Sequence, residues 1–388
     1  MLGAIILVPI VVVMYLMLCY YIGRKIKILL TNKGIKFIPK VYWTAYWFIA
    51  LSYVIGSLLK LVLPVDNIIL EVLILIGGFS ICSFIYLVLI FGIIDIIKFC
   101  FKRVKIGEKF KILLKKIYSD GLTVFILAIC LVIYGFWNAQ NKVITNYEVN
   151  IDKQVEGLNS LNIVMVSDIH MGSGVKEKSI DEMVNSINNL NADIVVFPGD
   201  LFDESTNDEL KKYSSNAFEN IKSKYGTYFV TGNHEYISGE IEEIISSLED
   251  GNVTVLKDEA INIDNKFILV GRNDESDSRI TGNRTKSLDE IMKSVDKNYP
   301  IIVLDHKPDR FQESIDSGGD LQLSGHTHKG QLSPGNLITN IINENDYGIL
   351  SRDGANLIVS SGYGTWGFPI RIGSKSEIVN IKVTFENK

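Results

Sequence analysis

The five histidines of this chain are the residues whose type and placement suggest chemistry. Each lies just after a short apolar run that predicts a buried strand, and none lies elsewhere; they are His170, His234, His306, His326 and His328. Taken singly, each histidine is better explained as a surface or capping residue than as a ligand. Ligands of α/β proteins gather at the carboxyl ends of strands, so five histidines in this one kind of position favour a shared site.

Asp168 and His170 indicate what such a site could bind. The run Ile163–Val166 predicts a short buried strand, which leads through Ser167 into both residues. Side chains two apart in a strand point to the same side, so this carboxylate and this imidazole can meet at one point. Such a pair suits a divalent metal ion. On these residues alone, a helix-capping Asp beside an incidental surface His is the alternative.

The elements that would position these residues alternate in type. After a polar connector at 139–159, apolar runs bounded by turn residues predict strands, and apolar residues three or four apart predict helices. This order predicts an α/β domain with a mixed sheet or two sheets over residues 160–388. The expected strands are 161–167, 194–197, 227–230, 253–256, 261–264, 267–271, 301–304, 321–324, 356–361 and 377–385, and the expected helices are 177–190, 207–222, 239–249, 285–296 and 309–316.

The first 138 residues differ from the rest and predict a membrane anchor. Aromatic residues gather at the ends of their apolar stretches, as in the interfacial belts of membrane proteins. No polar stripe or broken helix marks a transport path, so we expect residues 1–138 to anchor the chain, with a transport or lipid-access role as the alternative. The stretches that reach the roughly 20 residues needed to cross a bilayer are 2–22, 42–63, 69–94 and 121–138.

Charges in the connecting loops predict which side of the membrane the α/β domain faces. Residues 24–40 carry six basic and no acidic groups, residues 95–118 carry eight basic and two acidic groups, and the connection at 64–67 carries no basic group. Because basic loops stay in the cytoplasm, both basic loops would be cytoplasmic. Four spans then put the N-terminus and residues 139–388 outside. The predicted location is the cell membrane, multi-pass, with an extracytoplasmic domain.

Charge and cysteine content exclude some functions of the α/β domain. From residue 139 onward, 24 basic and 39 acidic residues give a net charge of −15, whereas 15 basic and 5 acidic residues give +10 before it. An acidic domain argues against general nucleic-acid binding, which needs a basic surface. All four cysteines lie before residue 139. The domain therefore has neither a disulfide framework nor a zinc–cysteine site.

Five motifs, in this order, resemble those of the calcineurin-like metallophosphoesterase superfamily. They are D-x-H, G-D-x-x-D, G-N-H-E, a lone H and G-H-x-H, at Asp168/His170, Gly199–Asp200/Asp203, Gly232–Glu235, His306 and Gly325–His326/His328. The block at 362–377 looks like the C-terminal part of a bacterial membrane-anchored branch that is similar to UDP-2,3-diacylglucosamine hydrolases. Lys329 departs from that branch, which often has glycine there, and a four-span anchor is not part of the general pattern.

The resemblance implies a four-layer α/β/β/α sandwich with two divalent metal ions. Asp200 would contribute to both metal positions. Nitrogen and oxygen donors without thiolate suit Mn, Fe or Zn rather than Ca. The implied ligands are Asp168, His170, Asp200 and His328 for one ion, and Asp200, Asn233, His306 and His326 for the other.

The same resemblance implies hydrolysis of a phosphoester. Two cations would lower the pKa of a bridging water, so that hydroxide attacks phosphorus near neutral pH, and would stabilise the charge that develops on the phosphoryl oxygens. His234 would protonate the leaving group, and Asp203 would orient its imidazole. A helix N-cap is the alternative for Asp203. Glu235 and Asp305 have no implied role.

We therefore expect a membrane-anchored binuclear-metal phosphoesterase. Its substrate would be a phosphodiester or a lipid- or envelope-linked phosphate, because the anchor holds the site near the bilayer. The alternatives are a phosphomonoesterase or nucleotide hydrolase, and a non-catalytic metal-dependent binding module for the cell envelope. Arg272 or Arg279, in the polar segment 271–284, could meet phosphate, or this segment could be a solvated loop. The sequence indicates no oligomeric state.

Overall fold

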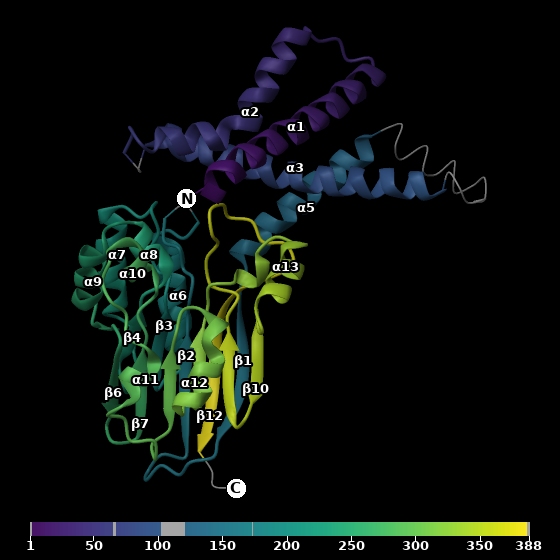
Figure 1. The fold of residues 1–388 in the computed structure, drawn as a ribbon. Coiled ribbons are helices and arrows are strands. Elements are labelled where there is room, and N and C mark those ends of the chain that lie inside the picture. Colours follow the sequence, from purple (N-terminus) through teal and green to yellow (C-terminus); the bar gives the residue numbers. More distant parts are fainter. Residues whose placement is uncertain (1, 65–66, 102–120, 173, 386–388) are drawn as a thin grey trace. The chain divides into compact units, whose positions relative to one another are not determined.

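The computed structural model of the protein describes residues 2–64, 67–101, 121–172 and 174–385 (Figure 1). The chain forms two compact units, Met1–Gly135 and Phe136–Lys388. The boundary lies inside the last apolar helix, so the second unit begins with the end of that helix. We describe each unit by itself.

The first unit consists of helices that are long and apolar enough to cross a membrane. Each of the four predicted spans corresponds to one of them. The helix at the N-terminus continues to residue 32, so the predicted loop at 24–40 is partly helical, because Lys and Arg are good helix formers. Residues 102–120 of the second predicted basic loop lie outside the described residues. The helices are α1 (Leu2–Asn32), α2 (Pro39–Leu59), α3 (Ile68–Phe101) and α5 (Leu122–Gln140).

Polar contacts join α1 to α3 where both approach their predicted basic loops. The Lys25 ammonium lies 3.9 Å from Asp95 Oδ2, and the Tyr21 hydroxyl donates a hydrogen bond of 3.1 Å to the same oxygen. The C-terminal parts of these two helices therefore lie side by side within the first unit. This arrangement agrees with the prediction that both basic loops are on one side of the membrane.

The second unit contains two six-stranded sheets of mixed direction. In the first sheet the order is β1-β12-β2-β3-β4-β5, and in the second it is β10-β11-β9-β8-β7-β6. Strands β2 to β5 are parallel in the first sheet, and β7, β8, β9 and β11 are parallel in the second. The strands are β1 (Lys142–Ile151), β2 (Ser160–Met165), β3 (Ile194–Pro198), β4 (Thr227–Val230), β5 (Val253–Leu256), β6 (Glu259–Ile263), β7 (Phe267–Gly271), β8 (Ile301–Leu304), β9 (Leu321–Ser324), β10 (Gly348–Arg352), β11 (Ala355–Val359) and β12 (Ser376–Phe385).

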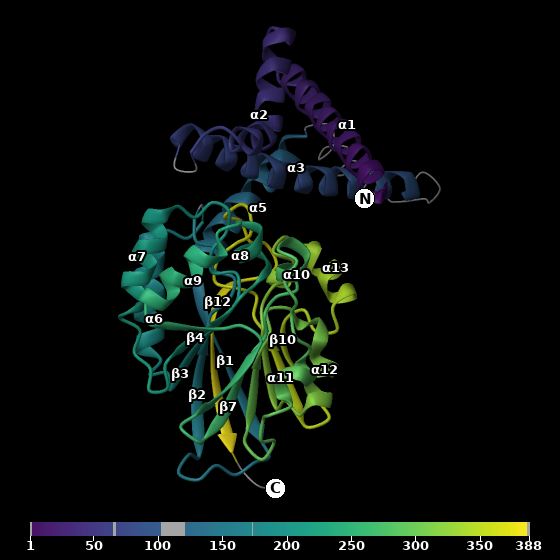
Figure 2. The same ribbon diagram turned by 60° about the vertical axis from the view of Figure 1, so that its left-hand side comes forward.

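Helices cover the outer faces of both sheets, so the unit has four layers. Figure 2 shows α6, α7 and α9 on one side of the sheets and α11 and α12 on the other. Alternate residues of each strand supply the two cores: Ile163 packs between the sheets, whereas Val164 packs under α6. This confirms the expected α/β/β/α sandwich. The helices are α6 (Glu177–Asn189), α7 (Asp208–Phe218), α8 (Asn233–Ile237), α9 (Ile241–Asp250), α10 (Ser276–Ile280), α11 (Leu288–Met292), α12 (Phe311–Ser317) and α13 (Gly335–Ile342), with 3₁₀ turns η1 (Pro308–Arg310) and η2 (His328–Gly330).

Strand β1 corrects the predicted connector at 139–159. Residues 142–151 form a ten-residue edge strand that pairs in parallel with β12. Its inward positions end in the buried Val149 and Ile151, while Asn146 and Glu148 face outward. An edge strand with one solvated face alternates apolar and polar residues, and its polar half resembles a connector in the sequence.

Candidate metal centre

The predicted ligands come together where parallel strands of both sheets end. Two motifs follow β2 and β3, a third begins α8 just after β4, and the remaining histidines follow β8 and β9. The two sheets therefore present their carboxyl ends to one site. The structure brings all seven predicted ligands to this edge, and the predicted acid His234 lies among them.

Asp200 connects the two groups of ligands through one oxygen atom. Its Oδ2 lies 3.0 Å from His306 Nε2 and 4.0 Å from His170 Nε2. Its other oxygen, Oδ1, accepts the backbone N–H of His234 at 2.9 Å. A side chain at Gly232 would overlap that oxygen, so glycine is required there. The carboxylate is thus fixed with one oxygen directed between the groups.

The first group consists of Asp168, His170 and His328, whose candidate ligand atoms all lie within 4.8 Å of one another. His170 Nε2 is 3.0 Å from His328 Nε2, and this latter atom is 3.5 Å from Asp168 Oδ1. The backbone N–H of His326 holds Asp168 with a bond of 2.9 Å to Oδ1. Three donor residues from two different loops, one after β2 and one after β9, therefore converge on one point.

The second group consists of Asp200, His306 and His326, again within 4.8 Å. His306 is oriented by its Nδ1, which lies 2.8 Å from the carbonyl oxygen of Pro198. If Nδ1 carries the proton, Nε2 keeps a lone pair that faces Asp200. The side-chain oxygen of Asn233 is buried nearby in the same pocket without a hydrogen-bond partner, which makes it available as a fourth donor.

The backbone at these ligands adopts a conformation that side chains disfavour. Asp168, His170, Asp200, His326 and His328 have φ values of 51°, 47°, 54°, 72° and 48°. Non-glycine residues in the left-handed region each cost on the order of 1 kcal/mol. Such strain persists where the surrounding structure enforces it and is concentrated at functional sites.

Glu235 supplies part of that enforcement. Its fully buried carboxylate accepts backbone N–H groups of Asp200, Leu201, Phe202 and Gly232, at 3.1, 2.7, 3.1 and 2.7 Å. The turn after β3 and the turn after β4 are therefore tied to one side chain. The family resemblance implies no role for Glu235, although its position directly after His234 was a usable signal.

The predicted acid His234 lies beside Glu204 rather than Asp203. Its Nδ1 is 3.5 Å from Glu204 Oε2, whereas Asp203 Oδ2 lies 4.0 Å from His170 Nδ1 and its Oδ1 accepts the N–H of Ser205 at 2.7 Å. Burial would lower the pKa of His234, but the negative charges of Glu204 and its neighbours outweigh burial and raise it to about 9. The structure therefore offers Glu204 as the orienting carboxylate.

Arg371 supports His328 from behind. Its fully buried guanidinium donates to the carbonyl oxygens of Ser361 and Gly364, both at 2.6 Å, and of Lys375 at 3.1 Å. Its Nη2 also lies 3.1 Å from His328 Nδ1. Burial lowers the pKa of Arg371 to about 10, so it stays charged at neutral pH. This residue joins the loop after β11 to a predicted ligand.

Neither arginine of the polar segment 271–284 contacts the ligand groups. Arg272 is buried and pairs with Glu313 at 2.8 Å and Asp305 at 3.3 Å. Arg279 is exposed and pairs with Glu275 on its own helix. Neither residue lines the pocket at the candidate metal centre, so the contact of one of them with phosphate stays a prediction without support from these positions.

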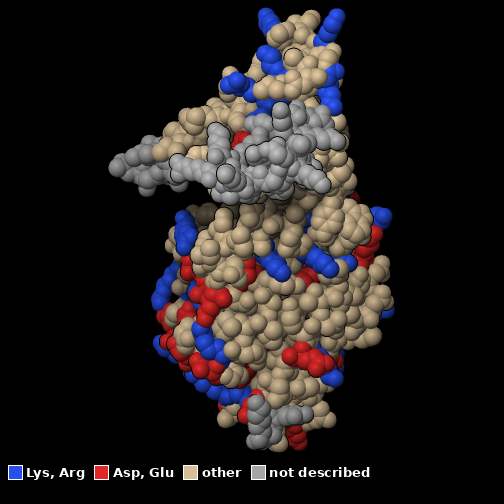
Figure 3. Space-filling view, turned by 90° about the vertical axis from the view of Figure 1, so that its right-hand side faces the viewer, with Lys and Arg blue, Asp and Glu red and all other residues tan. Residues whose placement is uncertain are grey.

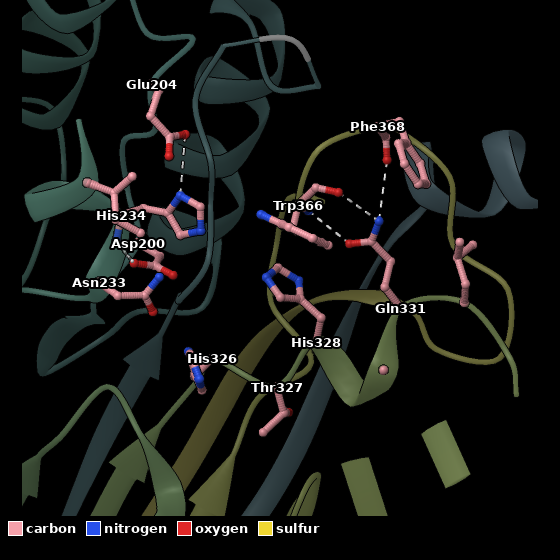
Figure 4. A pocket seen from close by; sticks show the side chains of 13 residues that line it. Asp200, Glu204, Asn233, His234, His326, Thr327, His328, Gln331, Trp366 and Phe368 are labelled. Carbon is pink, nitrogen blue, oxygen red and sulfur yellow. Dashed lines mark hydrogen bonds and ion pairs between the residues drawn. The ribbon is translucent and has the colours of Figure 1, made fainter. Parts of the chain in front are cut away.

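Four of the predicted ligands, Asp200, Asn233, His326 and His328, line an open pocket of about 600 Å³. Figure 4 shows two unlike walls, with His326 and His328 between them. One wall is polar and contains Asp200, Glu204, Asn233 and His234; the other contains Gln331, Trp366 and Phe368. Gln331 fixes this second wall, because its side chain accepts the Trp366 N–H at 2.8 Å and donates to the Trp366 carbonyl at 3.0 Å.

The electrostatics of the site fit cations. Burial lowers the pKa of His170 to about 3 and of His326 to about 4, so both rings are neutral and have a lone pair to donate at neutral pH. Burial also raises the pKa of Asp168 to about 6, which shows how costly its charge is without a positive partner. Together with the unpartnered oxygen of Asn233, these donors match a site for divalent ions.

Comparison with known proteins identifies the family. Residues 161–330 match the family described as calcineurin-like phosphoesterase. A metallophosphoesterase of Campylobacter jejuni is 31% identical over 278 residues, which cover 71% of this chain and 72% of that relative. The chain therefore belongs to the calcineurin-like metallophosphoesterases, a metal-dependent family whose ligand motifs are those collected at this site.

Two further relatives extend the comparison. An uncharacterized metallophosphoesterase of Helicobacter pylori is 34% identical over 59% of this chain and 61% of its own length. A transmembrane protein with metallophosphoesterase domain from Danio rerio is 30% identical over 68% of this chain and 62% of its own length. The match thus spans about three fifths of these two relatives. None of the three names states a substrate, so the likeness to UDP-2,3-diacylglucosamine hydrolases stays a prediction.

Proposed function

We propose that this protein is a membrane-anchored phosphoesterase with two divalent cations in its active site, and that it hydrolyses phosphodiesters or lipid- or envelope-linked phosphates. The observation that carries the proposal is the position of Asp200 Oδ2. This oxygen lies 3.0 Å from Nε2 of His306 in one ligand group and 4.0 Å from Nε2 of His170 in the other. A shared carboxylate oxygen is what two adjacent cations require. When bound, such cations activate water and stabilise charge on phosphoryl oxygens.

The residues of this chain would have distinct roles in binding the cations and in proton transfer. Asp168, His170 and His328 with Asp200 would hold one ion, and His306, His326 and Asn233 with Asp200 the other. His234 would give its proton to the leaving oxygen, since its raised pKa keeps it protonated at neutral pH. Glu204 would hold the imidazole with its proton directed toward the pocket. Mn, Fe and Zn all suit this donor set.

Hydrolysis by the purified full-length protein tests the proposal. The chain is stripped of metal, reloaded with Mn, Fe or Zn, and assayed with soluble chromogenic phosphodiesters and phosphomonoesters. We expect metal-dependent turnover with the diester preferred, and loss of most of it in His234→Ala. Asp316→Asn, a matched change at an exposed carboxylate, should be unaffected. Normal turnover by Asp200→Asn would refute the assignment, and a monoester preference would favour the phosphomonoesterase alternative.

The outward orientation of the second unit is part of the same proposal. Its support is the distribution of basic residues and the contact of Lys25 with Asp95, which agrees with basic loops on one side. All four cysteines lie in the first unit, so a chain without them can carry Ser294→Cys, an exposed position. A membrane-impermeant thiol reagent should label this residue in intact cells. Protection until the cells are lysed would reverse the topology.

A further inference from the structure

Helix α13 turns its apolar side away from the protein. Leu337, Ile338, Ile341 and Ile342 are 61%, 59%, 82% and 74% exposed, and none of the eight residues of the helix is buried. An amphipathic helix of a soluble domain directs its apolar stripe to the core. Helix α13 is reversed, so its apolar stripe needs a partner outside the described part of this unit.

The reversed orientation is held by specific contacts. Thr339 Oγ1 donates to Asp346 Oδ2 at 2.6 Å, and Asn340 Nδ2 lies 3.4 Å from Asp346 Oδ1. The backbone oxygen of Asp346 in turn accepts the hydroxyl of Thr327 at 2.6 Å. Since Thr327 stands between the predicted ligands His326 and His328, the polar side of α13 is tied to the metal-site loop.

Apolar side chains continue from α13 to the mouth of the pocket. Leu332, three residues before the helix, lines the pocket together with Trp366, which is 58% exposed, and Phe368. Seen from the side of the unit on which α13 lies, residues other than Lys, Arg, Asp and Glu cover most of the middle of the surface (Figure 3). Charged residues are densest along one edge, and smaller groups of them lie elsewhere on this face. The wall of the pocket opposite His234 is therefore apolar at Leu332, Trp366 and Phe368, and Leu332 leads directly to α13.

The chain enters this unit at the same place. The last residues of α5 belong to it, and Asn138 Nδ2 donates to the carbonyl oxygens of Arg371 at 3.1 Å and Ser374 at 2.8 Å. That loop also holds the base of α13, because the N–H of Ser333 donates to the carbonyl oxygen of Ile372 at 2.6 Å. A helix long and apolar enough to cross a membrane thus ends on the loop that supports α13.

We propose that α13 lies in the surface of the bilayer that the chain's own helices span, and that the pocket takes the phosphate of an amphiphile from that surface. Short helices with an aliphatic face and nearby Trp bind at membrane interfaces in this way. Helix α13 contains no Lys or Arg, so contact rests on apolar area rather than on anionic lipid. The second part of the proposal rests on the proposed function; the first does not.

Lipid quenching tests the bilayer contact without using activity. A cysteine-free full-length chain carries a bimane label at Ile341→Cys, or at Ser294→Cys as the control, in phosphatidylcholine nanodiscs. Lipids with a nitroxide on the acyl chain should lower the fluorescence at 341 about twofold or more and leave 294 nearly unchanged, if the helix is inserted. Equal fluorescence at both positions would overturn the proposal. So would disulfide cross-linking between two chains at 341 without quenching, because a second copy would then cover the helix.

Activity on two substrates tests delivery to the pocket. The double variant Ile341→Glu/Ile342→Glu is compared with Ile280→Glu, the same change at an isoleucine of α10 that is 52% exposed. On a long-chain phosphodiester in phosphatidylcholine vesicles, the double variant should lose about tenfold or more in kcat/KM. On a short soluble diester it should match the parent. Equal rates on the vesicle substrate, or equal losses on both, would overturn the proposal, whereas a parent inactive on every ester would instead count against the proposed function.

Discussion

Removal of the Glu204 charge should shift the alkaline limit of activity to lower pH. Glu204 Oε2 lies 3.5 Å from Nδ1 of His234, and its charge stabilises the protonated imidazole, which is the proposed proton donor to the leaving group. Glu204→Gln keeps the size and hydrogen-bonding capacity but removes the charge. The pKa of His234 then falls, so the active protonated form disappears at a lower pH.

The size of the shift follows from the distance and the exposure. Two unit charges 3.5 Å apart interact by about 1.2 kcal/mol in a water-like dielectric. Because the Glu204 side chain is 42% exposed, this low value is the appropriate one. One pKa unit corresponds to about 1.4 kcal/mol, so we expect a shift of about one pH unit. Bound cations lower the pKa of His234 in both proteins alike, so the difference is preserved.

The assay is kcat/KM against pH with a soluble chromogenic diester, because that ratio reports groups of the free enzyme. Glu209→Gln, at an exposed position in α7, is the matched control and should leave the profile unchanged. Because exposed charges are screened, the shift should shrink in about 1 M salt. An alkaline limb at the same pH in Glu204→Gln and the parent would show that Glu204 does not act on the acid.

Three further predictions concern the supports of the site. In Glu235→Gln, two of the four buried N–H groups that the carboxylate accepts would face an amide NH₂ instead. Each unsatisfied N–H costs about 1–3 kcal/mol, so the Tm of the second unit should fall clearly. An unchanged Tm would contradict this. Arg371→Lys keeps the charge but loses donors to several carbonyl oxygens. Competition with a chelator should show a metal affinity that is weaker by about tenfold or more. Equal affinity in the variant and the parent would show that Arg371 does not support the site. Gly364→Ala would overlap the Ile169 carbonyl oxygen and should lose bound metal, while Gly354→Ala, which has open space, should keep it; equal metal content would refute the clash.

The sequence predicted which residues come together at the candidate metal centre, because their positions depend on a simple rule. Side chains that follow parallel strands meet at one edge of a sheet, so the residues after β2, β3, β4, β8 and β9 could be assigned to one site before the sheets were known. The strands β5, β7, β8 and β9 begin and end where their apolar runs do. Short strands that are mostly apolar and bounded by turn residues make clear patterns, as in β7 and β8, whose residues are all buried.

Three features of the site and its surroundings were not predicted, because they depend on tertiary contacts or on segments too short to show a pattern. Asp203 and Glu204 are adjacent acids that the sequence does not distinguish. In the structure the N–H of Ser205 donates to Asp203 Oδ1, and Glu204 is the acid that lies beside His234. Arg371 belongs to the block at 362–377 that carries the resemblance, but it had no predicted role, because an arginine in a loop is usually exposed. Here several carbonyl oxygens surround it. Helix α13 was missed because eight residues after a proline are too few to show a period.

The left-handed backbone at five predicted ligands bears on how this chain can change by mutation. At His170, Asp200 and His328, with φ between 47° and 54°, glycine would relieve local strain while removing a donor. Such substitutions should make the metal-free chain more resistant to unfolding even as they abolish catalysis, since activity and stability oppose each other at strained sites. A lineage released from selection for hydrolysis would therefore gain foldability by losing these residues first.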